Sequence, residues 1–106
     1  MTTQNNQRLS DDLVKILLAL KKPGDLKAFF RDLCTLDELK EINERWQIVL
    51  LLTKQKTYRE IAKKLQVSTT TVARVAYWLN NGQGGYQTAL KKLNLHLPHT
   101  KPFSQG

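Results

Sequence analysis

The stretch from Thr57 to Leu79, TYREIAKKLQVSTTTVARVAYWL, holds two short helical patterns back to back, each with its own start signal. Thr57 can cap the first helix, and Glu60 three residues later completes a capping box. Ser68 can cap the second helix. Ala62 is small, as the crossing of two helices over a short turn requires. We expect the buried positions of this stretch to be Ile61, Leu65, Val72, Val75 and Leu79.

The two patterns together predict a helix-turn-helix over residues 57–79. Between its buried positions, the second helix carries short, hydrogen-bonding and basic side chains, and such a face can lie in a major groove and touch base edges. The turn position often holds glycine, and a left-handed Gln66 in its place would cost roughly 1 kcal/mol. A structural helical hairpin that binds nothing is the alternative interpretation.

The residues expected to contact DNA divide between the two helices. Threonine hydroxyls at the start of the second helix can serve several bases, and Arg74 can pair with a guanine through two hydrogen bonds. Ser68 and the helix N-terminus suit a phosphate. Residues of the first helix would hold the DNA backbone, although Lys63 could equally serve solubility alone. The full set is Thr57, Arg59, Lys63, Ser68, Thr69, Thr70, Thr71 and Arg74.

The charge of the chain favours a polyanionic partner. The formal net charge of the 106 residues is +8 at pH 7. Between residues 54 and 74 only Glu60 is negative, whereas six residues are positive, and this basic run coincides with the predicted helix-turn-helix. The six are Lys54, Lys56, Arg59, Lys63, Lys64 and Arg74. We therefore expect double-stranded DNA as the partner.

Several function classes find no support in the sequence. The single cysteine, Cys34, excludes an intrachain disulfide and a cysteine-only metal site. His96 and His99 lie in a tail with no nearby carboxylate or cysteine, so neither a metal centre nor an enzyme is expected. No run of about 18 apolar residues occurs, and the N-terminus lacks the apolar core of a signal peptide. We expect no membrane association and a cytoplasmic protein.

The remaining helices follow from caps and apolar spacing, and no strand alternation is found, so we predict an all-α fold of about six helices. Residues 1–9 should be flexible, residues 10–95 a single helical domain and residues 96–106 a flexible tail. The expected helix starts are capped by Ser10, Asp25 and Thr35. Besides the helix-turn-helix, the helices span about Leu13 to Leu20, Asp25 to Leu33, Leu36 to Thr53 and Tyr86 to Leu95.

Two helical segments, Leu13 to Leu20 and Ile48 to Leu52, are apolar on every side. Such a helix needs cover on more than one face. For the segment from Leu13 to Leu20, in a chain this small, a second subunit is the expected source of that cover. Trp46 and Trp78 stand at helical spacing, which favours core positions over stacking surfaces.

From about Phe29 to Leu93 the chain resembles the Trp repressor family, all-helical bacterial regulators in which two subunits interlock. The resemblance is carried by CTLDELKEINERWQIVLLL, by TYREIAKKLQVSTTTVARV and by the order long helix, helix-turn-helix, final helix. The segment LNNGQGGYQTALKKL looks more like an uncharacterised branch related to the Trp repressors than like the tryptophan-sensing members. The resemblance implies an intertwined homodimer whose N-terminal helices complete the core of the other subunit.

The resemblance also implies candidate ligand-binding residues. Arg45 and Arg74 fall where the tryptophan-sensing members carry two arginines that flank the indole, and Thr35 matches a threonine of the same pocket. Those members continue Arg-Gly-Ser-Asn-Ser, whereas this chain reads RVAYW from residue 74 to residue 78. The added bulk opposes binding of free tryptophan, and Tyr77 or Trp78 could fill part of its space. Three interpretations stay open: L-tryptophan as corepressor, another small corepressor, and the absence of any ligand. The sequence favours the last of these.

Arg45 also has a purely structural interpretation, an ion pair with Glu41 or Asp37 along the helix face. The sequence as a whole favours a dimeric helix-turn-helix regulator, a repressor that occupies a palindromic operator. Two recognition helices about 34 Å apart would read successive major grooves. The alternatives are an interaction module that keeps the fold without specific DNA binding, and the DNA-binding end of a transposase-like protein.

Overall fold

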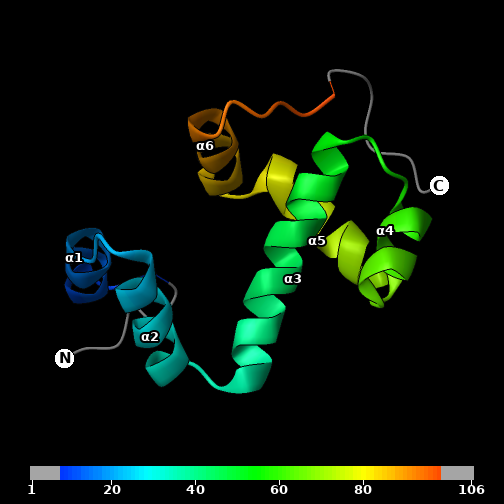
Figure 1. Cartoon of the computed structure of the whole chain (residues 1–106). Helices are drawn as coiled ribbons and strands as arrows, with labels where there is room; N and C mark the ends of the chain where they lie inside the picture. Colours follow the sequence, from blue (N-terminus) through cyan, green and yellow to red (C-terminus); the bar gives the residue numbers. More distant parts are fainter. Residues whose placement is uncertain (1–7, 99–106) are drawn as a thin grey trace. The chain divides into compact units, whose positions relative to one another are not determined.

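The computed structural model of the protein describes residues 8–98, which form six α-helices and no strand (Figure 1). This confirms the predicted all-α fold. The chain divides into two compact units between Leu39 and Lys40, and each is described by itself. The helices are α1 (Asp11–Ala19), α2 (Pro23–Leu33), α3 (Leu36–Thr53), α4 (Tyr58–Leu65), α5 (Thr69–Asn81) and α6 (Gly85–Lys92).

In the first unit, α1 begins as its cap signal predicts, because the Ser10 hydroxyl accepts a hydrogen bond from the backbone N–H of Leu13. The predicted start of α2 is wrong. Asp25 does not cap this helix, which begins two residues earlier at Pro23. Proline is well suited to a first helical position, because its ring fixes φ and the N–H that it lacks would have no partner there. Asp25 instead lies in the first turn, where its carboxylate favours the positive end of the helix.

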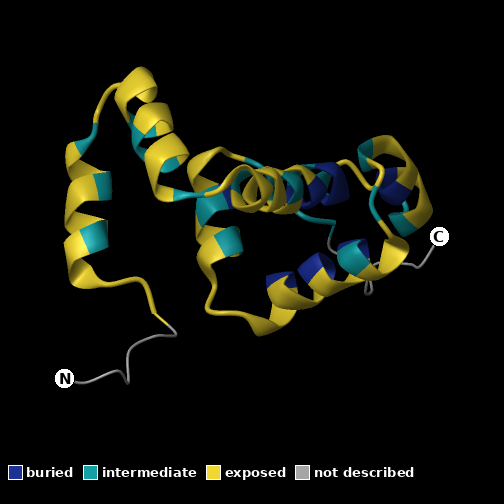
Figure 2. Ribbon diagram, turned by 90° about the horizontal axis from the view of Figure 1, so that it is seen from below, coloured by how far each residue is buried: buried dark blue, intermediate teal, exposed yellow. Residues whose placement is uncertain are grey.

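No described residue of the first unit is buried, as Figure 2 shows by the absence of dark blue from α1 and α2. Leu18 is 68% exposed and Leu36 is 65% exposed. Within the first unit, part of the apolar surface of α1 is therefore uncovered at Leu18.

Helix α3 has the predicted bounds and the predicted cap. The Thr35 hydroxyl accepts a hydrogen bond from the Glu38 N–H at 3.0 Å, and the Glu38 carboxylate accepts one from the Thr35 N–H at 2.9 Å. Only the C-terminal half of α3 supplies core residues. Four residues of the run from Ile48 to Leu52 are buried within the second unit, and Leu50 is half-buried.

The core of the second unit is built from α3, α4, α5 and α6, with α4 and α5 packed against each other as a helix-turn-helix. The predicted inward positions of the helix-turn-helix are all buried except Leu65, which is half-buried. Helix α6 ends at Lys92, earlier than expected, because Asn94 adopts a left-handed conformation with φ 58°. After this residue, Leu95 and Leu97 pack against the core. The core residues are Ile48, Val49, Leu51, Leu52, Ile61, Ala62, Val72, Val75, Ala76, Leu79 and Leu90.

Candidate nucleic-acid interface

Helix α4 begins with the predicted capping box. The Thr57 hydroxyl accepts a hydrogen bond from the Glu60 N–H at 3.1 Å, and the Glu60 carboxylate accepts one from the Thr57 N–H at 2.8 Å. The hydrogen bond from the Thr57 backbone, followed by the charge of Lys56, lowers the pKa of Glu60 below its ordinary value. The only acid of the helix-turn-helix is thus committed to starting α4 and stays ionised.

The turn between α4 and α5 has the conformation that the sequence disfavours. Gln66 is left-handed, with φ 59° and ψ 46°, in the place where glycine is common. This geometry lets the backbone N–H groups of Gln66 and Val67 both donate to the Ala62 carbonyl. The turn therefore satisfies the end of α4 at the cost of local strain in one exposed residue.

Helix α5 is capped by Ser68, whose hydroxyl accepts a hydrogen bond from the Thr71 N–H at 3.0 Å. The same hydroxyl also lies 3.0 Å from the Thr71 hydroxyl, and Thr71 is half-buried. Ser68 and Thr71 are thus partly engaged with each other. Thr69 and Thr70 are exposed, and their hydroxyls form no hydrogen bond with any residue between 8 and 98.

The basic candidates are all available at the surface. Arg59 and Lys63 are exposed and lie one turn apart on α4, with Lys56 just before the helix. Arg74 is exposed on α5 and forms no ion pair within the part of the chain that is described. Their role in DNA binding stays a prediction.

The positive charge belongs to the second unit. Residues 8–39 contain six basic and six acidic side chains, whereas residues 40–98 contain ten basic and three acidic ones. Because Glu41 and Glu44 lie on α3, Glu60 is the only acidic residue from α4 through α6. A helix-turn-helix with a net positive charge attracts a polyanion at long range.

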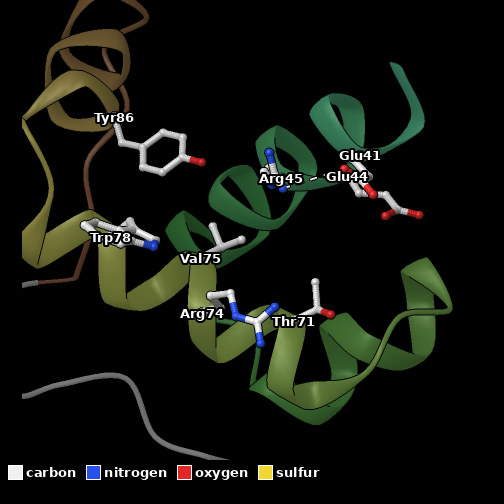
Figure 3. Close-up of a pocket in the computed structure, with 8 residues that line it drawn as sticks. All are labelled: Glu41, Glu44, Arg45, Thr71, Arg74, Val75, Trp78 and Tyr86. Carbon is white, nitrogen blue, oxygen red and sulfur yellow. Dashed lines mark ion pairs between the residues drawn. The ribbon is translucent and has the colours of Figure 1, made fainter. Parts of the chain in front are cut away.

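A cavity of about 420 Å³ lies between α3 and α5 and is bounded by Tyr86 of α6 (Figure 3). Arg45 and Arg74 both line it, as the resemblance implied. Thr35 belongs to the first unit, where its hydroxyl caps α3, and its part in a ligand site stays a prediction. The Arg45 guanidinium lies 3.8 Å from the Glu41 carboxylate, which confirms the structural interpretation of Arg45. The lining consists of Glu41, Glu44, Arg45, Thr71, Arg74, Val75, Trp78 and Tyr86.

The cavity wall differs from expectation at Trp78. This side chain is 52% exposed, so its prediction as a core residue is wrong, whereas Trp46 is half-buried and stacks on Tyr86 with ring centroids 6.3 Å apart. Glu44 and Tyr86 were missed as lining residues, because only the packing of three separate helices brings them to the cavity. The buried Val75 lines the same cavity. The extra side-chain volume expected at this position therefore lies in the cavity wall.

A comparison with known families matches the Trp repressor protein family over residues 8–94. The chain belongs to the Trp repressor family. An uncharacterised protein of Bacillus subtilis strain 168, YerC, is 34% identical over 83 residues, which are 78% of this chain and 80% of YerC. The Trp repressor fold is also found in solved structures. A TrpR-like protein from Eubacterium eligens is 33% identical with a TM-score of 0.74, over 79% of this chain and 87% of that one.

A second solved structure, of a candidate Trp repressor from Staphylococcus aureus, is 27% identical with a TM-score of 0.77, over 92% of this chain and 100% of that one. Membership of the Trp repressor family confirms a helix-turn-helix protein of the transcription-regulating, non-enzymatic kind, with DNA binding as the family activity. Within residues 8–98, no helix is long and apolar enough to cross a membrane, and no three metal-ligating side chains gather. His99 lies outside the described residues.

Proposed function

We propose that this chain is a sequence-specific DNA-binding regulator that represses transcription by occupying a palindromic operator as a homodimer. One observation carries the proposal. The helix that would enter the groove, α5, buries one face in the core and leaves two unpartnered hydroxyls and an unpaired guanidinium at its surface. These are Thr69, Thr70 and Arg74, the side-chain types that read base edges.

The residues around this face supply positioning. Thr57 and Ser68 cap α4 and α5, and their helix N-termini, like Thr71, suit phosphate oxygens. Arg59 and Lys63 supply exposed positive charge on α4. Contacts of this kind fix the register of the protein on the duplex and make binding depend on salt.

The homodimer is supported by the first unit, which has neutral charge balance, no buried residue and several exposed aliphatic side chains. Apolar helices without cover are stabilised when another surface buries them. We infer that the first unit associates two subunits while the positively charged second unit binds DNA. The partner being DNA, we place the protein in the cytoplasm.

We further propose that DNA binding requires no corepressor. Val75 is buried at the cavity wall, and the Trp78 indole occupies another part of that wall. Arg45 is paired with Glu41 rather than held free for a ligand. Added L-tryptophan should therefore leave DNA affinity unchanged, and an affinity that rises with L-tryptophan would contradict this proposal.

The test is fluorescence anisotropy of labelled duplexes titrated with protein over a series of salt concentrations. The native chain should lose affinity steeply, by about 0.9 log units per phosphate contact for each tenfold rise in salt. Arg59→Ala should weaken all duplexes alike and lower that slope, whereas Arg74→Ala should relax sequence preference. Lys92→Ala removes an exposed lysine of α6 and serves as the matched control. A shallow slope for the native chain would favour the interaction-module alternative, which the exposed apolar residues of the first unit also support.

A further inference from the structure

The outward face of α5 extends beyond the residues assigned so far. At 3.6 residues per turn, positions 70, 73, 74 and 77 share one face, opposite the buried positions 72, 75, 76 and 79. All four outward residues are exposed. Tyr77 lies at the centre of this face and is 56% exposed, although it is the largest residue on it.

The size of the side chains changes along this face. Thr70 and Ala73 are short, so the first two turns can approach base edges closely. Tyr77 lies seven residues after Thr70, about 10 Å farther along the axis at 1.5 Å per residue. When the N-terminal end of a recognition helix enters the groove, a position two turns later lies nearer the groove edge, where the sugar-phosphate backbone runs. A long side chain with a terminal donor is what can reach a phosphate from there.

The Tyr77 ring is already oriented. It packs edge-on against the Trp78 indole, with centroids 5.1 Å apart and planes at 87°. The Asn81 side-chain amide donates to the Tyr77 carbonyl at 2.9 Å, which supports the last turn of α5. The phenol hydroxyl makes no hydrogen bond within the described residues, so it remains available.

From these observations, and resting on the proposed function, we propose that Tyr77 is a further DNA-contacting residue whose phenol donates a hydrogen bond to a backbone phosphate beside the groove that α5 reads. Tyrosine is among the side chains that contact phosphates in this way. Its contact differs from those of Arg59 and Lys63, because a neutral donor replaces no condensed counterion. Tyr77 thus adds affinity without adding salt dependence.

The experiment is the same anisotropy titration with Tyr77→Phe, a change that keeps the ring and its contact with Trp78 while deleting the hydroxyl. Loss of a hydrogen bond to a charged group should weaken binding by about tenfold or more. The slope of log affinity against log salt should equal that of the native chain. Thr88→Val deletes an exposed hydroxyl of α6 and should change neither quantity. Unchanged thermal melting of both variants excludes a folding defect.

A duplex with one methylphosphonate in place of a phosphate identifies the contact. At one position flanking the site, this substitution should weaken DNA binding by the native chain and leave the affinity of the Tyr77→Phe variant unchanged. Native affinity in Tyr77→Phe, or equal sensitivity of both proteins at every methylphosphonate, would overturn the Tyr77 contact while the proposed function stands. If the native chain binds no duplex, or binds duplexes with only a weak dependence on salt, both the Tyr77 contact and the proposed function would be overturned.

Discussion

Replacing Gln66 by glycine should stabilise the protein, because Gln66 holds a left-handed conformation with φ 59°. A residue with a Cβ pays about 1–2 kcal/mol for this conformation. Glycine avoids that cost but loses about 0.5–1 kcal/mol more backbone entropy on folding. The exposed Gln66 side chain makes no hydrogen bond that would be lost. The free energy of unfolding should therefore rise by about 0.5–1 kcal/mol, which raises Tm by about 2–8 °C for a domain of this size.

The chain offers matched controls for this change at two other exposed glutamines. Gln55 is also left-handed, with φ 62°, so Gln55→Gly should stabilise by a similar amount. Gln47 lies inside α3, where glycine should destabilise by roughly 0.5–1 kcal/mol. Thermal and urea unfolding of the three variants shows whether each substitution raises or lowers the free energy of unfolding. Destabilisation by Gln66→Gly comparable to that by Gln47→Gly would refute the conclusion that the turn strains Gln66.

Three further predictions concern the stability of the helix-turn-helix. Ser68→Ala should lower the free energy of unfolding by about 1 kcal/mol in urea titrations, because α5 loses its cap, whereas Ser68→Gly should cost only a few tenths; equal costs would contradict the cap assignment. Because the folded pKa of Glu60 is lowered, its contribution is present above the ordinary pKa of 4.5 and is lost as pH falls through the folded value, so Glu60→Gln should flatten the acid limb of stability measured against pH. An unaltered acid limb would contradict the contribution of the Glu60 carboxylate to stability. Ile61→Ala should cost about 2–5 kcal/mol in the same titrations, since Ile61 is fully buried, and a cost below 1 kcal/mol would contradict the packing.

Local signals in the sequence predicted local structure well. The caps at Ser10, Thr35, Thr57 and Ser68 are confirmed. They could be predicted because each depends on residues within three positions of one another. The predicted start of α2 was wrong because Asp25 and Pro23 give competing start signals. The helix begins at Pro23, which occupies its first position.

Features that depend on packing between helices were harder to predict. Helical spacing places Trp78 beside the buried Val75 and Leu79, yet a side chain at the margin of a buried stripe is covered only if another helix reaches it. The cavity wall likewise joins Glu44 of α3 to Tyr86 of α6, which no spacing within one helix indicates. The cover that α4–α6 give the run from Ile48 to Leu52 likewise depends on packing between helices, which the sequence alone does not reveal.

The most direct test of the central claim is selection of bound sequences from a random duplex library at near-physiological salt, with and without L-tryptophan. A homodimer that presents two copies of α5 should enrich a motif with two-fold symmetry, its half-sites about one helical turn apart. The same motif should appear in both arms. Enrichment of no motif in either arm would contradict sequence-specific DNA binding by this helix-turn-helix, and a motif found only with L-tryptophan would contradict the corepressor-independent action proposed for it.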